Sequence, residues 1–286
     1  MGANEVFKRI NRKRPKMSKS QIKIANYILE NPHSVPFLTG NKLAKAIGVS
    51  EATVVRFATF LEYSGYNDLQ SALVKTAERQ LNTVERLQMS RTVYDETEKT
   101  IYDIFDDDIN NIKSTIQTLN IDDFKRAADY ILKANRIYII ANRSAVSLGT
   151  FLQYYLDIIL GNSELIHTTA AAFDRIYNVN KNDVVIGISF ARYTKSTIDI
   201  ASFAYEKQAK IIALTDQFTS PITAYADVAL YSKSQMPTFI DSFTAPISLI
   251  NALIAYIGNA KHININERLE QLEQLWDRYH VFHNNS

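Results

Sequence analysis

The sequence predicts two parts of different fold class: an all-α N-terminal helix-turn-helix domain and an α/β C-terminal domain built on a parallel sheet. In the first part apolar residues recur only at helical spacing, whereas after residue 135 short apolar runs alternate with helical stretches. Such runs are typical of strands that helices cover on both faces. With 286 residues, of which 46% are hydrophobic, the chain is long enough to bury two cores.

The stretch Gly40–Thr59 carries the clearest local pattern in the N-terminal part. A first helix is indicated by apolar residues that share one face, namely Leu43, Ala44 and Ile47. Gly48 can take a positive φ and so end this helix in a tight turn. Ser50 can cap a second helix, whose inward residues are expected to be Val54 and Phe57. Two short helices joined by such a turn form a helix-turn-helix unit.

The second helix of this unit is expected to enter the major groove of double-stranded operator DNA. We expect Thr53 and Arg56 to read base edges, and Lys42, Lys45 and Ser50 to contact phosphates. The full expected DNA-binding set is Lys42, Lys45, Ser50, Glu51, Thr53 and Arg56. The alternative is an ordinary helical hairpin, which would show part of the same pattern.

Charge is distributed unevenly along the chain. Residues 1–90 hold 14 basic and 7 acidic side chains, whereas the remainder holds 18 and 23. This asymmetry favours a polyanionic partner at the N-terminal end, although an ordinary solvated surface would also account for it. The basic run at 8–16 is either a flexible arm that contacts DNA or a solvated terminus.

Composition excludes several classes of protein. The chain has no cysteine and five scattered histidines, so we expect no disulfide, metal site or cofactor. The N-terminus lacks the apolar core of a signal peptide. Residues 243–260 are uncharged but contain several polar residues, which favours a buried or subunit-packed helix over a membrane span. The sequence therefore predicts a cytoplasmic protein that does not bind a membrane.

Further helices are predicted at 18–31, 67–89, 93–119 and 122–134, the last with Asp122 as its cap. In the first, Ile22, Ala25, Ile28 and Leu29 are expected to face inward. The stretch 93–119 is interpreted as a connecting helix that packs on the next domain through its apolar residues, namely Ile101, Ile104, Phe105, Ile109, Ile112 and Ile116. The expected domains are a DNA-binding domain at 1–90, a helical connector at 91–119 and a ligand-binding and dimerisation domain at 120–286.

In the C-terminal part, strands are predicted at 136–141, 164–167, 183–189, 210–215 and 228–232. Helices are predicted at 145–160 and, after the third strand, in a stretch that ends at Lys207. Ligands of open parallel sheets bind beyond the carboxyl ends of the strands. Two loops there lead into helices, whose N-termini favour anions. The residues expected to bind an anionic metabolite are Asn142, Arg143, Ser144, Ser189, Arg192 and Thr194. The alternative is that Ser144 and Thr194 simply cap helices.

Several motifs together resemble the RpiR family of bacterial transcriptional regulators, and the resemblance covers nearly the whole chain. They are I-G-V-S-E-A-T-V-V-R-F (47–57), S-G-Y-N-D-L (64–69), I-I-A-N-R-S-A (139–145), D-V-V-I-G-I-S-F-A-R-Y-T-K-S-T (183–197), I-I-A-L-T-D (211–216), S-P-I-T-A-Y-A-D-V (220–228) and D-S-F-T-A-P-I (241–247). The resemblance implies a C-terminal sugar-isomerase (SIS) domain with strand order 2-1-3-4-5, so that both candidate loops face one crevice.

In SIS domains the pattern S-x-S-G-x-T binds a sugar phosphate. Ser189 and Thr194 match its first serine and its threonine, whereas Ala191 replaces the second serine and Arg192 the glycine. The resemblance therefore implies either a phosphosugar or another anionic metabolite held partly by Arg192.

The leading hypothesis is a non-enzymatic, ligand-responsive DNA-binding regulator. It acts as a homodimer or tetramer, because paired half-sites require at least two copies. A second hypothesis is a sugar-phosphate isomerase, with Glu164 or His167 as the base. A third is a DNA-binding protein that uses its SIS domain only to oligomerise. The sequence leaves open the effector, the operator and the sign of regulation.

Overall fold

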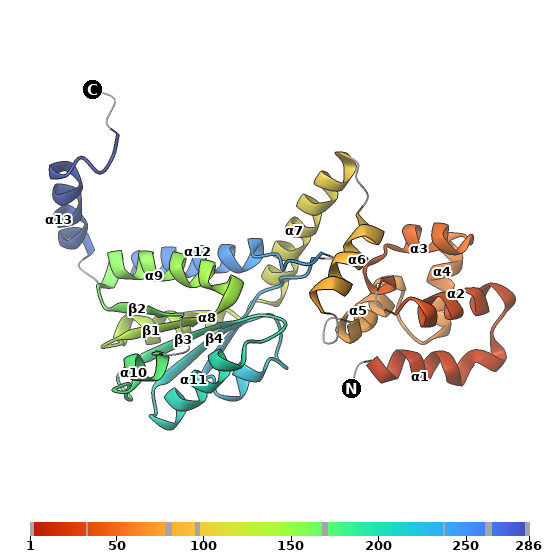
Figure 1. The fold of residues 1–286 in the computed structure, drawn as a ribbon, viewed down its shortest axis with the longest axis horizontal. Coiled ribbons are helices and arrows are strands. Elements are labelled where there is room, and N and C mark those ends of the chain that lie inside the picture. The colour runs from red at the N-terminus through yellow and green to blue at the C-terminus, as the bar shows by residue number, and fades with distance from the viewer. Residues whose placement is uncertain are drawn as a thin grey trace. The chain divides into compact units, whose positions relative to one another are not determined.

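A computed structural model describes residues 3–32, 34–77, 82–94, 98–167, 171–236, 238–260 and 265–283. These residues form two compact units. The helical unit runs to Phe105 and also includes the segment Met236–Asp241, and the second unit comprises Asp106–Gln235 and the residues from Ser242 onward. The predicted fold class, a helical part followed by an α/β part, is confirmed (Figure 1).

The helical unit contains helices α1 (Ala3–Lys13), α2 (Lys19–Glu30), α3 (Gly40–Ile47), α4 (Glu51–Phe60), α5 (Tyr66–Ala77) and α6 (Thr83–Val93). Its core includes the fully buried Leu43, Val54 and Phe57, as the spacing predicts. In α2 the four residues expected to face inward do so, since Ala25 and Ile28 are buried and Ile22 and Leu29 pack half-buried against the core. The prediction missed Ile24, which is fully buried.

Two sequence-based expectations for this unit differ from the structure. The basic run at 8–16 is not a flexible arm, because it lies in α1 and a 3₁₀ turn and Ile10 is fully buried. Four of its six cations are exposed to solvent, namely Lys8, Arg12, Arg14 and Lys16. The predicted helix at 67–89 is interrupted at Asn82, whose backbone is extended. Asn82 starts α6 with a capping box, in which its side chain accepts from the Glu85 N–H and Glu85 accepts from the Asn82 N–H. Residues 78–81 of that prediction lie outside the described residues.

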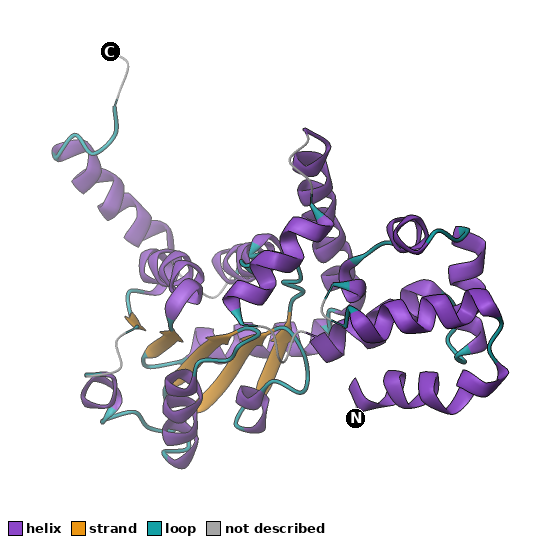
Figure 2. Ribbon diagram, turned by 45° about the vertical axis from the view of Figure 1, so that its right-hand side comes forward, coloured by secondary structure: helices purple, strands orange, loops and turns teal. Residues whose placement is uncertain are grey.

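The second unit is built on a parallel sheet of β1 (Ile137–Ala141), β2 (Ser163–Ile166), β3 (Val184–Ser189), β4 (Lys210–Thr215) and β5 (Val228–Tyr231). The strand order 2-1-3-4-5 is confirmed. One face packs on α8 (Ile121–Lys133), α9 (Val146–Leu160) and α12 (Thr244–Gly258), and the other packs on α10 (Ala172–Ile176) and α11 (Lys195–Glu206) (Figure 2). The cap of α8 is Asn120 rather than Asp122, because the side-chain Oδ1 of Asn120 accepts from the backbone N–H groups of Asp122 and Asp123.

The connecting helix α7 (Glu98–Thr118) is oriented differently from the expectation. Its buried residues are the polar Asn111 and Thr115. Asn111 Nδ2 donates to Gln235 O at 2.7 Å, and Thr115 Oγ1 accepts from Lys233 N at 2.9 Å. Most of its apolar side chains are exposed, so the expected packing through them is wrong.

The last described helix, α13 (Ile265–Arg278), was not predicted from the sequence. Arg268 joins it to the end of α9, where the guanidinium donates to the carbonyls of Asp157 and Ile158 at 2.8 and 2.9 Å. Gly161 makes room for this contact, since a Cβ there would lie 2.7 Å from the guanidinium carbon. None of the residues of α13 is buried.

No helix within the described ranges is long and apolar enough to cross a membrane. Over the same ranges, no group of three or more His, Asp or Glu side chains is arranged to hold a metal ion.

Candidate nucleic-acid interface and ligand crevice

The helix-turn-helix is formed by α3 and α4 with the predicted turn chemistry. Gly48 has φ 74°, a left-handed conformation, and ends α3. Ser50 caps α4, and its Oγ accepts from Thr53 N at 3.3 Å. Both roles are as the sequence predicts. The short turn fixes the angle at which α4 leaves α3, so the outward face of α4 is a defined surface.

That outward face carries a connected set of polar side chains. Arg56 is exposed, and its Nη2 donates to Thr53 Oγ1 at 3.3 Å. The Thr53 hydroxyl also lies 2.8 Å from Ser50 Oγ. Glu51 is exposed at the positive end of the helix. Hydroxyl and guanidinium groups in this arrangement are the donors and acceptors that base edges and phosphates require.

The two expected phosphate contacts on α3 are placed differently from each other. Lys45 is exposed. Lys42 is half-buried, and its Nζ lies 3.8 Å from an Asp103 carboxylate oxygen. Lys42 would therefore have to leave or weaken this ion pair to contact DNA.

Sequence analysis missed the residues that hold α4 in place. Lys13 Nζ donates to Phe60 O at 2.7 Å, and Arg9 donates to Leu61 O at 3.2 Å, so that cations of α1 meet the negative end of α4. Tyr66 OH donates to Leu38 O at 2.6 Å, and burial raises the pKa of this phenol. These contacts join residues some 28 to 52 positions apart, which no local pattern reveals.

The second candidate site lies at the carboxyl end of the parallel sheet. Ser189 ends β3, is only 3% exposed, and its backbone carbonyl accepts from Thr215 Oγ1 at 2.6 Å. Its own Oγ is buried and has no hydrogen-bond partner among the described residues. A buried hydroxyl without a partner costs about 1–3 kcal/mol, which a ligand can recover by bonding to it.

Two arginines flank this end of the sheet in the same unusual backbone conformation. Arg143 follows β1 with φ 56°, and Arg192 follows β3 with φ 63°. Both are exposed, and β1 and β3 are neighbours in the sheet. Glycine adopts such a φ freely, which explains the glycine of the S-x-S-G-x-T pattern. Here both positions carry a cation instead.

The helices that follow these loops are not capped by side chains. Thr194 is the N-cap residue of α11 and Ala145 that of α9, and neither side chain accepts a capping hydrogen bond. The simple capping interpretation of Ser144 and Thr194 is therefore wrong. Ser144 lies exposed in a 3₁₀ turn. Asn142 is buried and donates to Thr197 Oγ1 at 2.9 Å, which joins the loop after β1 to the first turn of α11.

A third loop, after β4, adds a group that sequence analysis did not consider. Tyr193 OH donates to Asp216 Oδ1 at 2.9 Å and accepts from Gln217 Nε2 at 2.9 Å. Burial raises the pKa of Asp216 above its ordinary value, and burial followed by the Asp216 charge raises the pKa of Tyr193. The phenol thus stays protonated and fixes the carboxylate at the carboxyl end of the sheet.

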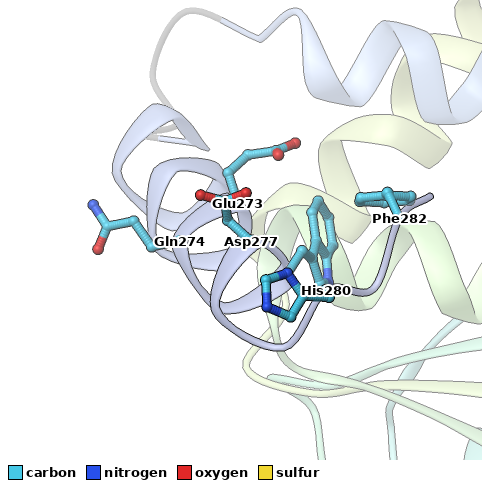
Figure 3. Close-up of a pocket in the computed structure, with 6 residues that line it drawn as sticks. Glu273, Gln274, Asp277, His280 and Phe282 are labelled. Atoms are coloured by element: carbon cyan, nitrogen blue, oxygen red, sulfur yellow. The ribbon is translucent and has the colours of Figure 1, made fainter. Parts of the chain in front are cut away.

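A separate hollow lies on the last turns of α13, lined by Glu273, Gln274, Trp276, Asp277, His280 and Phe282 (Figure 3). Phe282 turns back toward the helix, with its ring 5.5 Å from that of Trp276. Two carboxylates border this hollow, so it is electrostatically unsuited to an anionic ligand.

Comparison with known proteins assigns both parts of the chain. A model of the rpiR-family helix-turn-helix domain matches residues 4–80, and a SIS-domain model matches residues 130–256. This chain belongs to the RpiR family. An HTH-type transcriptional regulator of Caldanaerobacter subterraneus subsp. tengcongensis is 29% identical over 262 residues, which cover 90% of this chain and 91% of the relative. The Escherichia coli K12 regulator RpiR is 24% identical over 268 residues, covering 88% and 84%.

A solved structure covers both parts of this RpiR-family regulator. The Vibrio vulnificus NanR protein, in complex with ManNAc-6P, is 21% identical with a TM-score of 0.57, and the match covers 98% of this chain and 100% of that one. This likeness shows the shared fold.

The residues proposed for an isomerase are placed as follows. Glu164 lies within β2 and accepts from Arg175 Nε at 2.6 Å, and His167 is exposed just after the strand. The curated relatives are named transcriptional regulators.

Proposed function

We propose that this RpiR-family regulator binds double-stranded operator DNA through α4 and that an anionic metabolite in the SIS crevice modulates this binding. The observation that carries the first half is the outward face of α4, where Ser50, Thr53 and Arg56 form one hydrogen-bonded row. In this proposal Thr53 and Arg56 read base edges, whereas Ser50, Lys45 and, after release from Asp103, Lys42 contact phosphates. Glu51 lies at the helix start, within reach of a cytosine amino group.

The DNA half is tested on a duplex selected by the wild-type protein from a randomised library. Arg56→Ala should lose about 1–3 kcal/mol of affinity for the selected duplex and little for random DNA, as expected for a base-reading arginine. Lys45→Ala should weaken binding to both and reduce the salt slope by about 1. Lys125→Ala, an exposed lysine of α8, serves as the control. Unchanged binding of Arg56→Ala by fluorescence anisotropy would remove this residue from the reading set.

The ligand half rests on the crevice. An anion there would meet the unsatisfied Ser189 hydroxyl, the uncapped N-termini of α9 and α11, and the cations Arg143 and Arg192. We infer that Ser144 and Thr194 add hydroxyl donors and that Asn142 holds the loop after β1 against the first turn of α11. A phosphosugar fits this chemistry, and ManNAc-6P bound to NanR supports the class.

Thermal unfolding in the presence of phosphosugars tests this half, starting with ManNAc-6P and with inorganic phosphate for comparison. A ligand at 100 times its Kd stabilises the folded state by about 2.7 kcal/mol. We expect Ser189→Ala and Arg192→Ala to reduce the shift, and Lys181→Ala, an exposed cation before the amino end of β3, to leave it unchanged. No stabilisation by any phosphosugar or carboxylate would favour a SIS domain that serves oligomerisation alone.

We further propose that the regulator is at least a dimer. Two recognition helices must reach half-sites about 34–36 Å apart on one face of the duplex. A ligand that favours one arrangement of the copies would then change operator affinity, typically by about 1–3 kcal/mol.

A further inference from the structure

The connecting helix α7 exposes an apolar stripe that nothing in the single chain covers among the described residues. The exposed fractions are 70% for Tyr102, 63% for Phe105, 45% for Ile109 and 66% for Ile116. Ile112 lies on the same stripe and is half-buried. Large apolar side chains in such a contiguous row mark an interaction surface.

The spacing of the stripe is that of a coiled coil. Tyr102, Phe105, Ile109, Ile112 and Ile116 follow one another at alternating intervals of three and four residues. This is the a and d pattern of a heptad repeat, in which a helix packs against another helix of the same kind. Ile101, which is 57% exposed, flanks this stripe at position g.

The rotation of α7 about its own axis is fixed by hydrogen bonds on its other side. Besides Asn111 and Thr115, the Asp108 carboxylate accepts from Ser242 Oγ, and from Thr244 Oγ1 at 2.8 Å. Turning the apolar stripe inward would break all of these bonds. The stripe is therefore available to a partner from outside the chain.

We propose that the α7 stripe pairs with the α7 stripe of a second copy in an antiparallel coiled coil. This rests on the proposed dimer and names its surface. Asp106 and Lys113 occupy the same heptad position, e, beside the stripe, and both are exposed. In an antiparallel two-fold pair, position e faces position e, so Asp106 meets Lys113 of the partner subunit twice. A parallel pair would instead require Asp108, which is already bonded to Ser242 and Thr244.

Single cysteines test this geometry cleanly, because the chain has no cysteine of its own. Ile109 lies close to the midpoint between Asp106 and Lys113, so Ile109→Cys should form a disulfide-linked dimer under mild oxidation. Asn110→Cys, one residue further along, is also exposed but lies about 100° around the helix, outside the a and d stripe. It is the matched control and should not cross-link. Tyr102→Cys should not cross-link either, because the two copies would lie roughly 20 Å apart at 1.5 Å per residue.

Charge exchange provides a second, independent readout by sedimentation equilibrium. Asp106→Lys and Lys113→Asp should each raise the dimer Kd several-fold, and the double variant should recover most of the loss. Circular dichroism of each variant verifies that α7 and the remaining helices stay folded.

The outcomes separate this surface from the proposed function. A wild-type protein that is monomeric at about 10 µM contradicts the dimer itself. A wild-type dimer in which Ile109→Cys fails to cross-link overturns only the α7 surface and points to another element as the occupant. Efficient cross-linking of Tyr102→Cys overturns the antiparallel orientation.

Discussion

Arg192 combines an unfavourable backbone with a useful side chain. A non-glycine residue at φ 63° costs about 1–2 kcal/mol relative to a right-handed conformation. The cation lies in the loop after β3, two residues before the N-cap residue of α11. The backbone strain is therefore compatible with a role in binding, in which the contact of the guanidinium with the ligand offsets the cost of the left-handed conformation.

Replacing Arg192 with glycine should separate these two effects. Glycine relieves the strain but gains freedom in the unfolded chain, so the free energy of unfolding should stay within about 1 kcal/mol of wild type. Anion affinity should fall tenfold or more, since the charge-assisted contact is lost. Arg192→Lys keeps a positive charge at the same φ, so its anion affinity should lie between those of the wild type and the glycine variant. Equal affinity for glycine and arginine in calorimetric titration would contradict the binding role.

Asp216 predicts a pH dependence of stability. Burial raises its pKa in the folded state above the unfolded value of about 4, so the folded protein holds this proton more tightly. This contribution to stability is present at low pH and is lost as pH rises through the folded-state pKa. Asp216→Asn lacks the titration, so its stability relative to wild type should increase from pH 4 toward neutrality. Urea unfolding at each pH measures the difference, and parallel curves would refute the assignment.

For single residues, the sequence predicted local roles such as helix caps and turns better than hydrogen bonds between residues far apart in the chain. Ser50 and Gly48 were found because capping and left-handed turns depend on one residue and its immediate neighbours. The left-handed φ of Arg192 could have been predicted from the glycine that it replaces. The Tyr193–Asp216 pair could not, since its members come from loops after different strands.

At the scale of elements, the two ends of α9 are handled differently. Its N-terminus follows the loop after β1 and has no side-chain cap, whereas its C-terminal carbonyls accept hydrogen bonds from the Arg268 guanidinium beside Gly161. The charge that neutralises the negative end of α9 comes from α13. Helix α13 has no buried residue, so the hydrogen bonds of Arg268 to α9 are important in holding α13 against the rest of the sheet unit.

Alanine substitutions of the glycines at the C-terminal ends of α9 and α12 should have opposite effects on the free energy of unfolding. Gly161→Ala forces a side chain into φ 72° and into the guanidinium, and should cost about 1–2 kcal/mol. Gly258→Ala, at the last position of α12, places its Cβ 3.8 Å from Ile159 Cδ1 of α9, which is an ordinary van der Waals contact, and should stabilise by up to about 1 kcal/mol. Chemical denaturation of both variants checks the signs. Hydrogen exchange in α13 should rise only in Gly161→Ala.

Helices and strands were predictable where their pattern is local. The parallel strands appear as short apolar runs, and α3 and α4 as two apolar faces around a glycine. The orientation of α7 was missed because its polar side chains find their partners far along the chain, with Asn111 bonding a residue 124 positions later. Periodicity identified the apolar stripe correctly but could not tell whether its partner lay in the same chain.

At the scale of the whole molecule, the two units are interleaved in sequence. The chain leaves the sheet unit after Gln235, contributes Met236–Asp241 to the helical unit, and returns at Ser242. Within the helical unit Arg86 binds this segment, donating to Thr238 O at 3.0 Å and Ile240 O at 2.9 Å and pairing with Asp241 at 2.7 Å. The Arg86 and Asp241 side chains are 14% and 18% exposed, so water screens the pair only weakly.

Removing this arginine should loosen the crossing segment. Arg86→Ala leaves a half-buried carboxylate without its cation and should destabilise the helical unit by about 3 kcal/mol. Phe239, which is 50% exposed, should then become a faster site of chymotrypsin cleavage. Arg91→Ala, an exposed residue of the same helix α6, is the matched control. Equal cleavage rates in the two variants would show that Arg86 does not hold the segment.

This interleaving limits how the protein can be cut or recombined. A fragment that stops before the sheet would lack the six residues 236–241, which belong to the helical unit. An isolated fragment of the sheet unit would carry these residues without Arg86, which binds them in the full chain. Chimaeras that exchange the helical unit of one regulator for that of another should therefore transfer residues 236–241 together with the N-terminal helices, as two separate segments of the sequence.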